Sequence, residues 1–363
     1  MNKNKILLIS NMYPSINFPS YGTFIKTIEE NLIFSGWNVK KIVMLKEKNK
    51  AKKLFSYLCF GIHSYFSILF SEEKIVYVHY LTHSAIPLLL MPKPKHLVVN
   101  IHGADLLAHT SIQKKLLFVT KHAVKKADLV IVPSVVFQER LIQHYQTPKE
   151  KIYISPSGGV KLPTQIISKT FEPQKEITFG FVGRIVKEKG WKTIFQAVDL
   201  LDFRSISKMK LVFVGTGKED NLLKEISKNF EKKYPNLSIE ILGEVKHEMI
   251  NSIFQRFDFF IFPSESESES LGLVGLEAMA NGIPVIGSDI GGISTYIKNE
   301  ENGFLFSPRD SKKLAQIIKK TFLMLDNDYQ YFSENACLSA KMVSNERVGE
   351  ELSLKFEKLR SEK

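Results

Sequence analysis

The chain has 363 residues, of which 44% are hydrophobic and 24% are charged, a composition typical of a soluble globular protein with two domains. No apolar run approaches the roughly eighteen residues of a membrane-spanning helix, and the basic start MNKNKILLIS indicates a first strand and not a signal peptide. Two cysteines, Cys59 and Cys337, make no disulfide framework, so a reducing cytoplasm is the expected location.

The positive charge is concentrated in the first half of the chain. Residues 1–165 contain 22 Lys and Arg against 9 Asp and Glu, a net charge of +13, whereas the whole chain carries +12. This asymmetry points to an anionic partner for the first half, which can be a membrane, a polyanion or a nucleic acid. No recognised nucleic-acid motif accompanies the lysines, so we expect no nucleic-acid partner.

The first elements predict a sheet with helices between its strands. Residues 6–10 form an apolar β-type run, a turn-rich segment follows up to Gly22, and apolar residues recur at helical spacing over 24–33. Residues 39–45 predict the next strand. The order of strand, glycine loop, helix and strand begins a doubly wound sheet, whose ligands bind beyond the carboxyl ends of its strands. One glycine is weak evidence for a binding loop, and Gly22 fits a plain turn equally well.

A cluster of five lysines lies just before an apolar segment. The lysines at positions 46, 48, 50, 52 and 53 precede residues 54–70, LFSYLCFGIHSYFSILF. This segment is too short and too often interrupted by serines to span a bilayer. We consider two alternatives: a helix packed into the first domain, or an aromatic face flanked by lysines that lies on a membrane surface.

Two further apolar runs, 74–79 and 96–101, predict buried parallel strands. The second ends in His102, Gly103, Ala104 and Asp105, which places His102 where a ligand of the sheet binds. A structural histidine that caps a turn is the alternative. His79 and His83 form no metal-binding pattern with it, because no cysteine or carboxylate lies nearby at ligand spacing. Later elements of this half are a helix over 112–127, strands at 129–132 and 152–154, and a polar linker between Pro163 and Pro173.

The second half repeats the pattern of strand and helix. The strand predicted at 177–182 leads into GRIVKEKGW, in which Gly183 and Arg184 precede Lys189. Arg184 can offer a planar fork to phosphate oxygens and Lys189 a point charge, so together they can neutralise a diphosphate, although two solvated cations remain the alternative. Strands follow at 210–214 and 238–242. The single GxG at 215–217 lacks the third glycine of a dinucleotide fingerprint.

The segment 264–280, SESESESLGLVGLEAMA, contains two glutamates seven residues apart, with small and aliphatic residues between them. A helix that begins near Leu271 places Glu269 just before its N-terminus and Glu277 on its second turn. The unpaired amides of the first turn favour an anion such as a phosphate, and Gly272 lets a ligand approach the backbone. The alternative is an ordinary amphipathic helix with two solvated glutamates.

This segment resembles the E-x7-E signature of retaining GT-B glycosyltransferases of family 4. GRIVKEKG resembles the family's G-R-x4-K-G segment, His102 to Asp105 its active-site histidine loop, and ENGFLFSP at 301–308 its closing segment. The resemblance covers nearly the whole chain and is strongest over 179–308. Two departures stand out: Leu271 replaces the family's Phe, and SPSGGV at 155–160 replaces an Asn-Gly-Val-Asp segment.

The resemblance implies an α/β protein with the GT-B fold, two Rossmann-like doubly wound domains that face a cleft. We expect an N-terminal acceptor domain over 1–165, a nucleotide-sugar donor domain over 166–345 and a C-terminal helix over 346–363 that crosses back to the first domain. The implied reaction moves a sugar from a nucleoside-diphosphate sugar, with a UDP-sugar as the expected donor, to a glycan or lipid-linked acceptor with retained configuration. Such an enzyme serves cell-surface polysaccharide biosynthesis, in the cytoplasm or peripherally on the inner face of the plasma membrane.

The resemblance also assigns residues to roles. The implied catalytic residues are Arg184 and Lys189 on the diphosphate, Glu269 on the donor sugar and His102 on the same sugar from the other domain. The implied donor-binding residues are Gly22, Gly183, Val245, Leu271, Gly272, Leu273, Val274 and Glu277, with Glu277 on the ribose hydroxyls.

We expect no cofactor and no metal, because the two cations replace a metal ion at the diphosphate. Asp326 and Asp328 form the D-x-D pattern of metal-dependent transferases, but they follow a predicted helix and are interpreted as its stop. Two other functions remain open. A sugar-nucleotide epimerase of the same fold would turn over the donor without an acceptor, and a non-catalytic polyanion-binding protein would use only the basic half.

Overall fold

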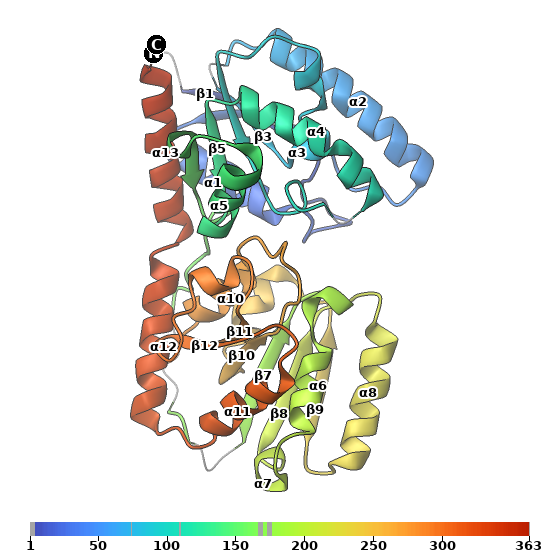
Figure 1. Ribbon diagram of the computed structural model, residues 1–363, viewed down its shortest axis with the longest axis vertical. Coiled ribbons are helices and arrows are strands. Elements are labelled where there is room, and N and C mark those ends of the chain that lie inside the picture. The colour runs from blue at the N-terminus through green and yellow to red at the C-terminus, as the bar shows by residue number, and fades with distance from the viewer. Residues whose placement is uncertain (1–3, 74, 109, 166–169, 173–175, 363) are drawn as a thin grey trace. The chain divides into compact units, whose positions relative to one another are not determined.

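The computed structural model describes residues 4–73, 75–108, 110–165, 170–172 and 176–362 (Figure 1). It divides into two compact units: unit 1 comprises Met1–Gly159 and Val343–Lys363, and unit 2 comprises Val160–Met342. The chain therefore passes between the units after Gly159 and again after Met342, where the sequence placed the boundaries after residues 165 and 345. The linker predicted between Pro163 and Pro173 contains residues 166–169 and 173, which lie outside the described residues.

Unit 1 is built on a six-stranded parallel sheet with the order β2-β1-β3-β4-β5-β6. A parallel sheet is covered on both faces, so its strands are apolar throughout, and Ile6 to Ile9 in the first strand have no exposed surface. The strands are β1 (Lys5–Ser10), β2 (Asn38–Val43), β3 (Ile75–His79), β4 (His96–Asn100), β5 (Leu129–Val132) and β6 (Ile152–Ile154).

Helices cover both faces of this sheet (Figure 1). On one face Ile6 and Leu8 pack with residues of α1 and with Leu352 and Phe356 of α13, the helix that returns to unit 1. The Trp37 indole N–H donates to Ser353 Oγ at 2.8 Å and ties α13 to the end of α1. The other face is covered mainly by α2, α4 and α5. The helices of unit 1 are α1 (Thr23–Phe34), α2 (Lys50–Leu69), α3 (Leu81–Ser84), α4 (Ser111–Lys126), α5 (Val135–Tyr145) and α13 (Asn345–Ser361).

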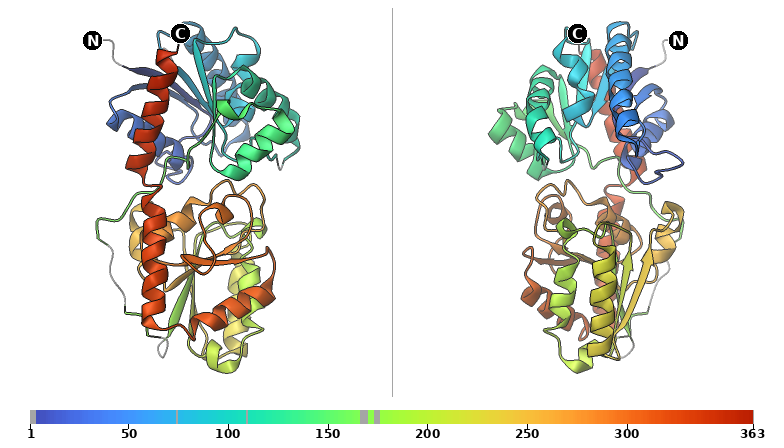
Figure 2. Two further views of the ribbon diagram at one scale, coloured as in Figure 1. Left: turned by 60° about the vertical axis from the view of Figure 1, so that its left-hand side comes forward. Right: turned by 90° about the vertical axis from the view of Figure 1, so that its right-hand side faces the viewer.

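Helix α2 packs against the sheet through a narrow stripe only. Phe60, Ser64 and Ile68 are buried, and Asn49 caps the helix by accepting hydrogen bonds from the Ala51 and Lys52 amides. The helix lies at the outside of unit 1 (Figure 2), and its exposed side chains are also largely apolar. The large apolar side chains that it exposes, each by 45% or more, are Leu54, Phe55, Leu58, Ile62, Phe66 and Leu69, followed by Phe70. The segment is thus a helix packed on unit 1, as the first alternative predicts, and binding of its exposed face to a membrane surface stays a prediction.

Unit 2 repeats the architecture with a sheet in the order β12-β11-β10-β7-β8-β9, again parallel. Its core is rich in aromatic residues, with Phe179, Phe213 and Phe259 all buried. The strands are β7 (Ile177–Val182), β8 (Met209–Val214), β9 (Ser238–Gly243), β10 (Phe259–Phe262), β11 (Val285–Ser288) and β12 (Gly303–Phe306). The helices are α6 (Lys192–Val198), α7 (Phe203–Ile206), α8 (Asp220–Lys233), α9 (Ile250–Phe254), α10 (Leu273–Ala280), α11 (Ser311–Thr321) and α12 (Asp326–Lys341).

Each sheet has one point where the chain reverses its direction of winding. In unit 1 this point lies between β1 and β3, and in unit 2 between β7 and β10. Loops that leave two such strands diverge to opposite faces and open a crevice at their carboxyl ends, where open α/β sheets bind ligands. The sheet order alone therefore marks the loops after β7 and β10 as the first place to look for a site in unit 2.

Candidate functional site

The predicted site residues of unit 2 gather at this reversal point. Gly183 and Arg184 directly follow β7, Lys189 ends the short 3-10 helix Lys187–Lys189, and Glu269 lies in the loop between β10 and α10. Arg184 is exposed and Lys189 and Glu269 are mostly buried. Two cations and a carboxylate from neighbouring strands therefore lie at one edge of the sheet.

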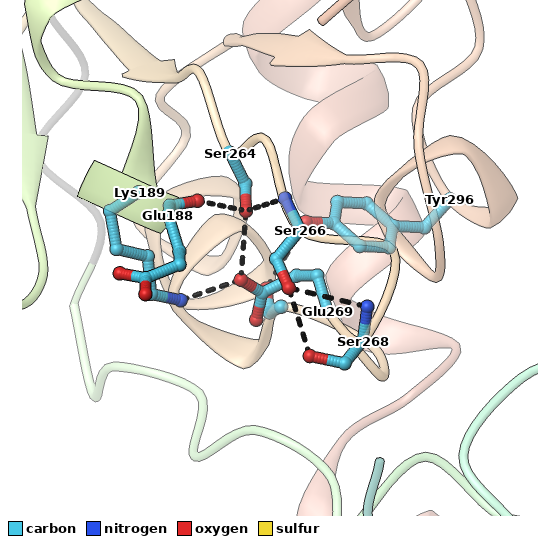
Figure 3. Close-up of polar contacts among 8 residues, drawn as sticks. Glu188, Lys189, Ser264, Ser266, Ser268, Glu269 and Tyr296 are labelled. Carbon is cyan, nitrogen blue, oxygen red and sulfur yellow. Dashed lines mark hydrogen bonds and ion pairs between the residues drawn. The ribbon is translucent and has the colours of Figure 1, made fainter. Parts of the chain in front are cut away.

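Lys189 and Glu269 form an ion pair (Figure 3). Lys189 Nζ lies 2.5 Å from Glu269 Oε2, and the two side chains are 19% and 14% exposed. Ser264, which is fully buried, donates from Oγ to the same carboxylate oxygen at 3.2 Å. Lys189 also lies over the ring of Phe262, 5.6 Å from its centroid. The pair is thus fixed by neighbours on both sides and partly shielded from solvent, which strengthens its electrostatic attraction.

The loop that carries Lys189 is held against the loop after β10. The Glu265 amide donates to Glu188 O at 2.9 Å. Gly190, at φ +67°, follows Lys189, and a Cβ there would lie 1.8 Å from Pro263 O. Only glycine combines this backbone conformation with so close an approach. The second glycine of GRIVKEKG, Gly190, is therefore explained by the contact between the two loops, and this contact sets the position of Lys189.

Helix α10 begins at Leu273, two residues later than predicted. Gly272 is its N-cap at φ +75°, and a Cβ on it would lie 2.5 Å from the Phe262 ring. The left-handed conformation at Gly272 turns the chain into the helix directly after Leu271, which is 5% exposed and lies in the core. Leu273 and Val274 thus form the first turn, whose amides point along the axis toward the crevice and favour an anion.

Tyr296 contacts the N-terminus of α10 and helps to hold it in place. Its hydroxyl donates to Gly272 O at 3.1 Å, and a Cβ on Gly275 would lie 2.2 Å from that hydroxyl oxygen. Burial, and in second place the charge of Glu269, raises the pKa of the Tyr296 hydroxyl well above its ordinary value. Tyr296 therefore remains a neutral hydrogen-bond donor.

The other donor-binding candidates of unit 2 are placed as follows. Glu277 is half-buried on the second turn of α10, as predicted. Val245 is half-buried and follows β9, the edge strand two positions from β7. The amide of Gly292 donates to Glu269 O at 2.8 Å, so the loop after β11 holds the backbone of the predicted sugar-binding glutamate.

Gly22 and His102 belong to unit 1 and lie at the carboxyl ends of its strands. Gly22 is the N-cap of α1 at φ +78°, and a Cβ there would lie 3.0 Å from backbone atoms of Met12 and Tyr13. His102 follows β4, and its ring lies near that of Phe24, with 4.5 Å between the centroids and the ring planes tilted by 44°. Gly22 thus follows a strand that borders the reversal point of unit 1, and His102 follows the strand one place beyond β3.

Asp105 shapes the loop that carries His102. It is fully buried and accepts hydrogen bonds from the His102 and Gly103 amides, each at 2.9 Å, and from the Leu81 amide at 3.3 Å. Burial raises the pKa of its carboxyl to about 6, against the opposing effect of these hydrogen bonds. The aspartate of the motif therefore organises backbone amides from two loops.

Sequence reasoning missed three residues at these sites. Ser264 and Tyr296 hold the predicted residues in place, and His79 contacts His102, as described below. Ser264 could not be distinguished from the other serines of the Ser-Glu repeat at 264–270, and neither Tyr296 nor His79 lies in a motif. The signal available for His79 was its position as a polar residue ending a buried strand.

The D-x-D aspartates have structural partners in the first turn of α12. Asp326 accepts from the Phe171 amide at 2.6 Å, and Asp328 accepts from the Leu325 amide at 3.4 Å. They thus begin a helix, whereas the sequence was interpreted as a helix stop. Among the residues that the structure describes, no three His, Cys, Asp or Glu side chains lie close enough together to hold a metal ion. Nor does any helix in the described ranges have the length and hydropathy of a membrane span.

Comparison with known proteins agrees with this arrangement. Residues 164–338 match the family model described as glycosyl transferases group 1. The matched residues include the whole loop system around Lys189 and Glu269.

Relatives with curated names share part of the chain. A sulfoquinovosyl transferase of Arabidopsis thaliana is 30% identical over 200 residues, which are 51% of this chain and 36% of that protein. A putative teichuronic acid biosynthesis glycosyltransferase of Bacillus subtilis is 26% identical over 228 residues, 61% of this chain and 54% of that protein. This chain thus spans about a third to a half of the length of these relatives.

The Anabaena protein HepE, solved in complex with UDP-glucose, is similar in structure with a TM-score of 0.75 at 18% identity, covering 98% of this chain and 99% of HepE. With its two parallel six-stranded sheets and helices on both faces, the chain has the predicted GT-B fold.

Proposed function

We propose that the chain is a retaining glycosyltransferase that moves a sugar from a nucleoside-diphosphate sugar, with a UDP-sugar as the first candidate, to a glycan or lipid-linked acceptor. The observation that carries the proposal is the Lys189–Glu269 ion pair at the reversal point of the sheet, with Lys189 in the segment after β7 that also contains Arg184. A diphosphate there meets two cations and the first-turn amides of α10, and the adjacent sugar meets a carboxylate that accepts hydrogen bonds from its hydroxyls.

In the proposed reaction the bond between the anomeric carbon and the β-phosphate oxygen breaks, and the acceptor oxygen bonds to the same carbon on the same face. The acceptor proton passes to the leaving diphosphate, so no carboxylate of the protein needs to act as a base. Arg184 and Lys189 stabilise the negative charge that develops on the diphosphate. The attraction between such preorganised charges and the developing negative charge is stronger in a site with little water than in bulk solvent.

The enzymatic test combines nucleotide binding with turnover. A thermal-shift screen against UDP, GDP, ADP and CMP identifies the base, because a ligand at about 100 times its dissociation constant stabilises the folded state by roughly 2.7 kcal/mol. With the matching sugar nucleotide, Arg184→Ala and Lys189→Ala should each lower kcat about 10²- to 10³-fold while the protein stays folded. Near-normal rates in both variants would refute the diphosphate assignment, and consumption of the donor without acceptor would favour an epimerase.

We also propose that unit 1 binds an anionic membrane through α2, which would bring the enzyme to a lipid-linked acceptor of cell-surface polysaccharide synthesis. The exposed apolar face of α2 is combined with lysines at its start, and its first turn contains no acidic residue. Positive charge at a helix N-terminus is unfavourable for the helix by a few tenths of a kcal/mol or more. An anionic surface would compensate this charge, and the apolar side chains would enter the headgroup boundary.

Vesicle co-sedimentation tests the membrane proposal. The test variant changes Lys46, Lys48, Lys50, Lys52 and Lys53 to Gln, and the control variant changes five exposed lysines of unit 2, Lys224, Lys228, Lys232, Lys312 and Lys319. Each engaged lysine contributes about 1 kcal/mol near an anionic surface, so the test variant should lose most binding and the control little. Equal binding to neutral and anionic vesicles, or equal losses in both variants, would contradict the proposal.

A further inference from the structure

Two histidine rings meet where β3 and β4 end. His79 is the last residue of β3 and His102 lies two residues beyond the end of β4. His79 Nδ1 lies 3.0 Å from His102 Nε2, and the rings are nearly parallel, 14° apart with centroids separated by 5.3 Å. The two imidazoles thus share one hydrogen bond, which one of them donates and the other accepts.

Both rings are neutral at physiological pH. His79 has no exposed surface, and burial lowers its pKa well below the ordinary value. Burial also lowers the pKa of His102 to about 3. A neutral imidazole has one N–H and one bare nitrogen. The contact therefore has only two proton arrangements, and the question is which ring donates.

The surroundings of His79 distinguish the two arrangements. Within the described part of the chain, His79 Nε2 is buried and has no hydrogen-bond partner. If His102 donates, His79 carries its own proton on this orphaned nitrogen, as a buried N–H without an acceptor. If His79 donates from Nδ1, the orphaned nitrogen is a bare acceptor. Orphaned buried donors are rarer in proteins than under-satisfied acceptors, which favours His79 as the donor.

We propose that His79 is a positioning residue that donates to His102 Nε2 and thereby holds the His102 proton on Nδ1. The Tyr77 ring, 4.1 Å from that of His79, and the Phe24 ring, 4.5 Å from that of His102, pack beside the pair and fix both ring planes. His102 is partly exposed, and its Nδ1 is absent from the buried unpartnered nitrogens of the described residues. His102 therefore presents an N–H donor to a ligand.

This proton placement rests on the proposed function for its consequence. An N–H donor recognises the lone pair of a sugar hydroxyl or another oxygen, whereas the opposite tautomer would accept a hydrogen bond from that hydroxyl. In a neutral histidine, the hydrogen bond made by one ring nitrogen commonly determines whether the other nitrogen carries the proton. His79 would thus determine the polarity of the sugar contact without touching the sugar.

The tautomer is measured directly by two-bond ¹H–¹⁵N correlation spectra of protein labelled at histidine nitrogens, with the His102 signals assigned through His102→Gln. We expect His102 to carry its proton on Nδ1 in the wild type and in His79→Asn, whose amide can still donate. In His79→Leu the His102 Nε2 loses its donor, and the proton should move toward Nε2. An Nε2–H tautomer in the wild type, or an unchanged tautomer in His79→Leu, would overturn the proposal.

Turnover gives a second readout. The kcat/KM for the sugar nucleotide should fall about tenfold in His79→Leu, the equivalent of one hydrogen bond of about 1.4 kcal/mol, and recover in His79→Asn. The same substitution is then made in a His102→Ala background. If His79→Leu lowers kcat/KM there as much as it does in the wild type, His79 acts on stability alone. If no sugar nucleotide is turned over by the wild type, the proposed function fails, while the spectra still decide the proton placement.

Discussion

The Lys189–Glu269 pair can be tested by a double-mutant cycle with Lys189→Met, Glu269→Gln and both changes together. Exposed ion pairs contribute about 0.2–1 kcal/mol, and breaking a fully buried pair costs about 3–5 kcal/mol. At 19% and 14% exposure the pair lies between these limits. We therefore expect a coupling free energy of about 1–3 kcal/mol.

The two single variants should differ in cost. Lys189→Met leaves the Glu269 carboxylate with Ser264 as its remaining side-chain donor in the described contacts, so we expect a loss of about 2–3 kcal/mol. Glu269→Gln leaves Lys189 over the Phe262 ring, a contact worth about 0.5–1 kcal/mol, and should cost less.

Urea unfolding monitored by tryptophan fluorescence measures these differences. The chain has two tryptophans, and a Trp37→Phe background leaves Trp191, which is buried in unit 2 two residues from Lys189. The matched control is Lys233→Met, which breaks a surface pair with Asp199 whose side chains are 56% and 40% exposed. Costs that add within about 0.3–0.5 kcal/mol would refute the coupling. Added UDP should stabilise the wild type and the control more than Lys189→Met.

Three further predictions follow from single contacts. Gly190→Ala should destabilise unit 2 by about 3 kcal/mol or more, because its Cβ would lie 1.8 Å from Pro263 O, whereas Gly36→Ala, with positive φ but open space, should cost only about 1–2 kcal/mol in unfolding experiments. Burial raises the Asp105 pKa from 3.8 to about 6, so the neutral carboxyl contributes its full stabilisation of the fold below pH 3.8 and this contribution is lost as the pH rises through 6. The free energy of unfolding of Asp105→Asn should therefore rise relative to that of the wild type, by up to about 3 kcal/mol, between pH 4 and pH 7 in parallel urea titrations. Transfer activity should survive EDTA, and loss of turnover that Mg²⁺ or Mn²⁺ restores would contradict a metal-independent reaction.

The strands and most helices could be predicted because their signals are local. The apolar run at Ile6 to Ile9 is buried on both faces, and this burial is what a continuous apolar run indicates. The start of α10 was misplaced by two residues because Gly272 adopts a left-handed conformation against the Phe262 ring. That contact joins the end of a strand to the start of a helix, and residue type alone does not indicate it.

The site was predicted as separate residues and not as an assembly. Lys189 and Glu269 were each assigned to a different part of the ligand, but their ion pair joins residues 80 positions apart. The same limit applies to His79, whose partner is 23 positions away. A motif reports which side chains a ligand requires, whereas the contacts among those side chains depend on which strands are neighbours in the sheet.

Helix α2 shows why some questions need the structure and a binding experiment together. Its apolar residues occupy nearly the whole circumference, so their helical period does not indicate which face is buried. The structure assigns Phe60 and Ile68 to the core and leaves Leu58, Ile62 and Phe66 exposed along one side. A contiguous apolar surface on a monomer commonly marks an interaction site, and exposed lysines at its end favour an anionic partner over an apolar protein face. We therefore expect binding to anionic vesicles to weaken with salt and to be lost when Ile62 and Phe66 are both changed to Gln. Electrostatic attraction alone predicts only the salt dependence, and apolar burial alone predicts only the effect of the two substitutions. Observing both results would show that the lysines and the apolar face act together.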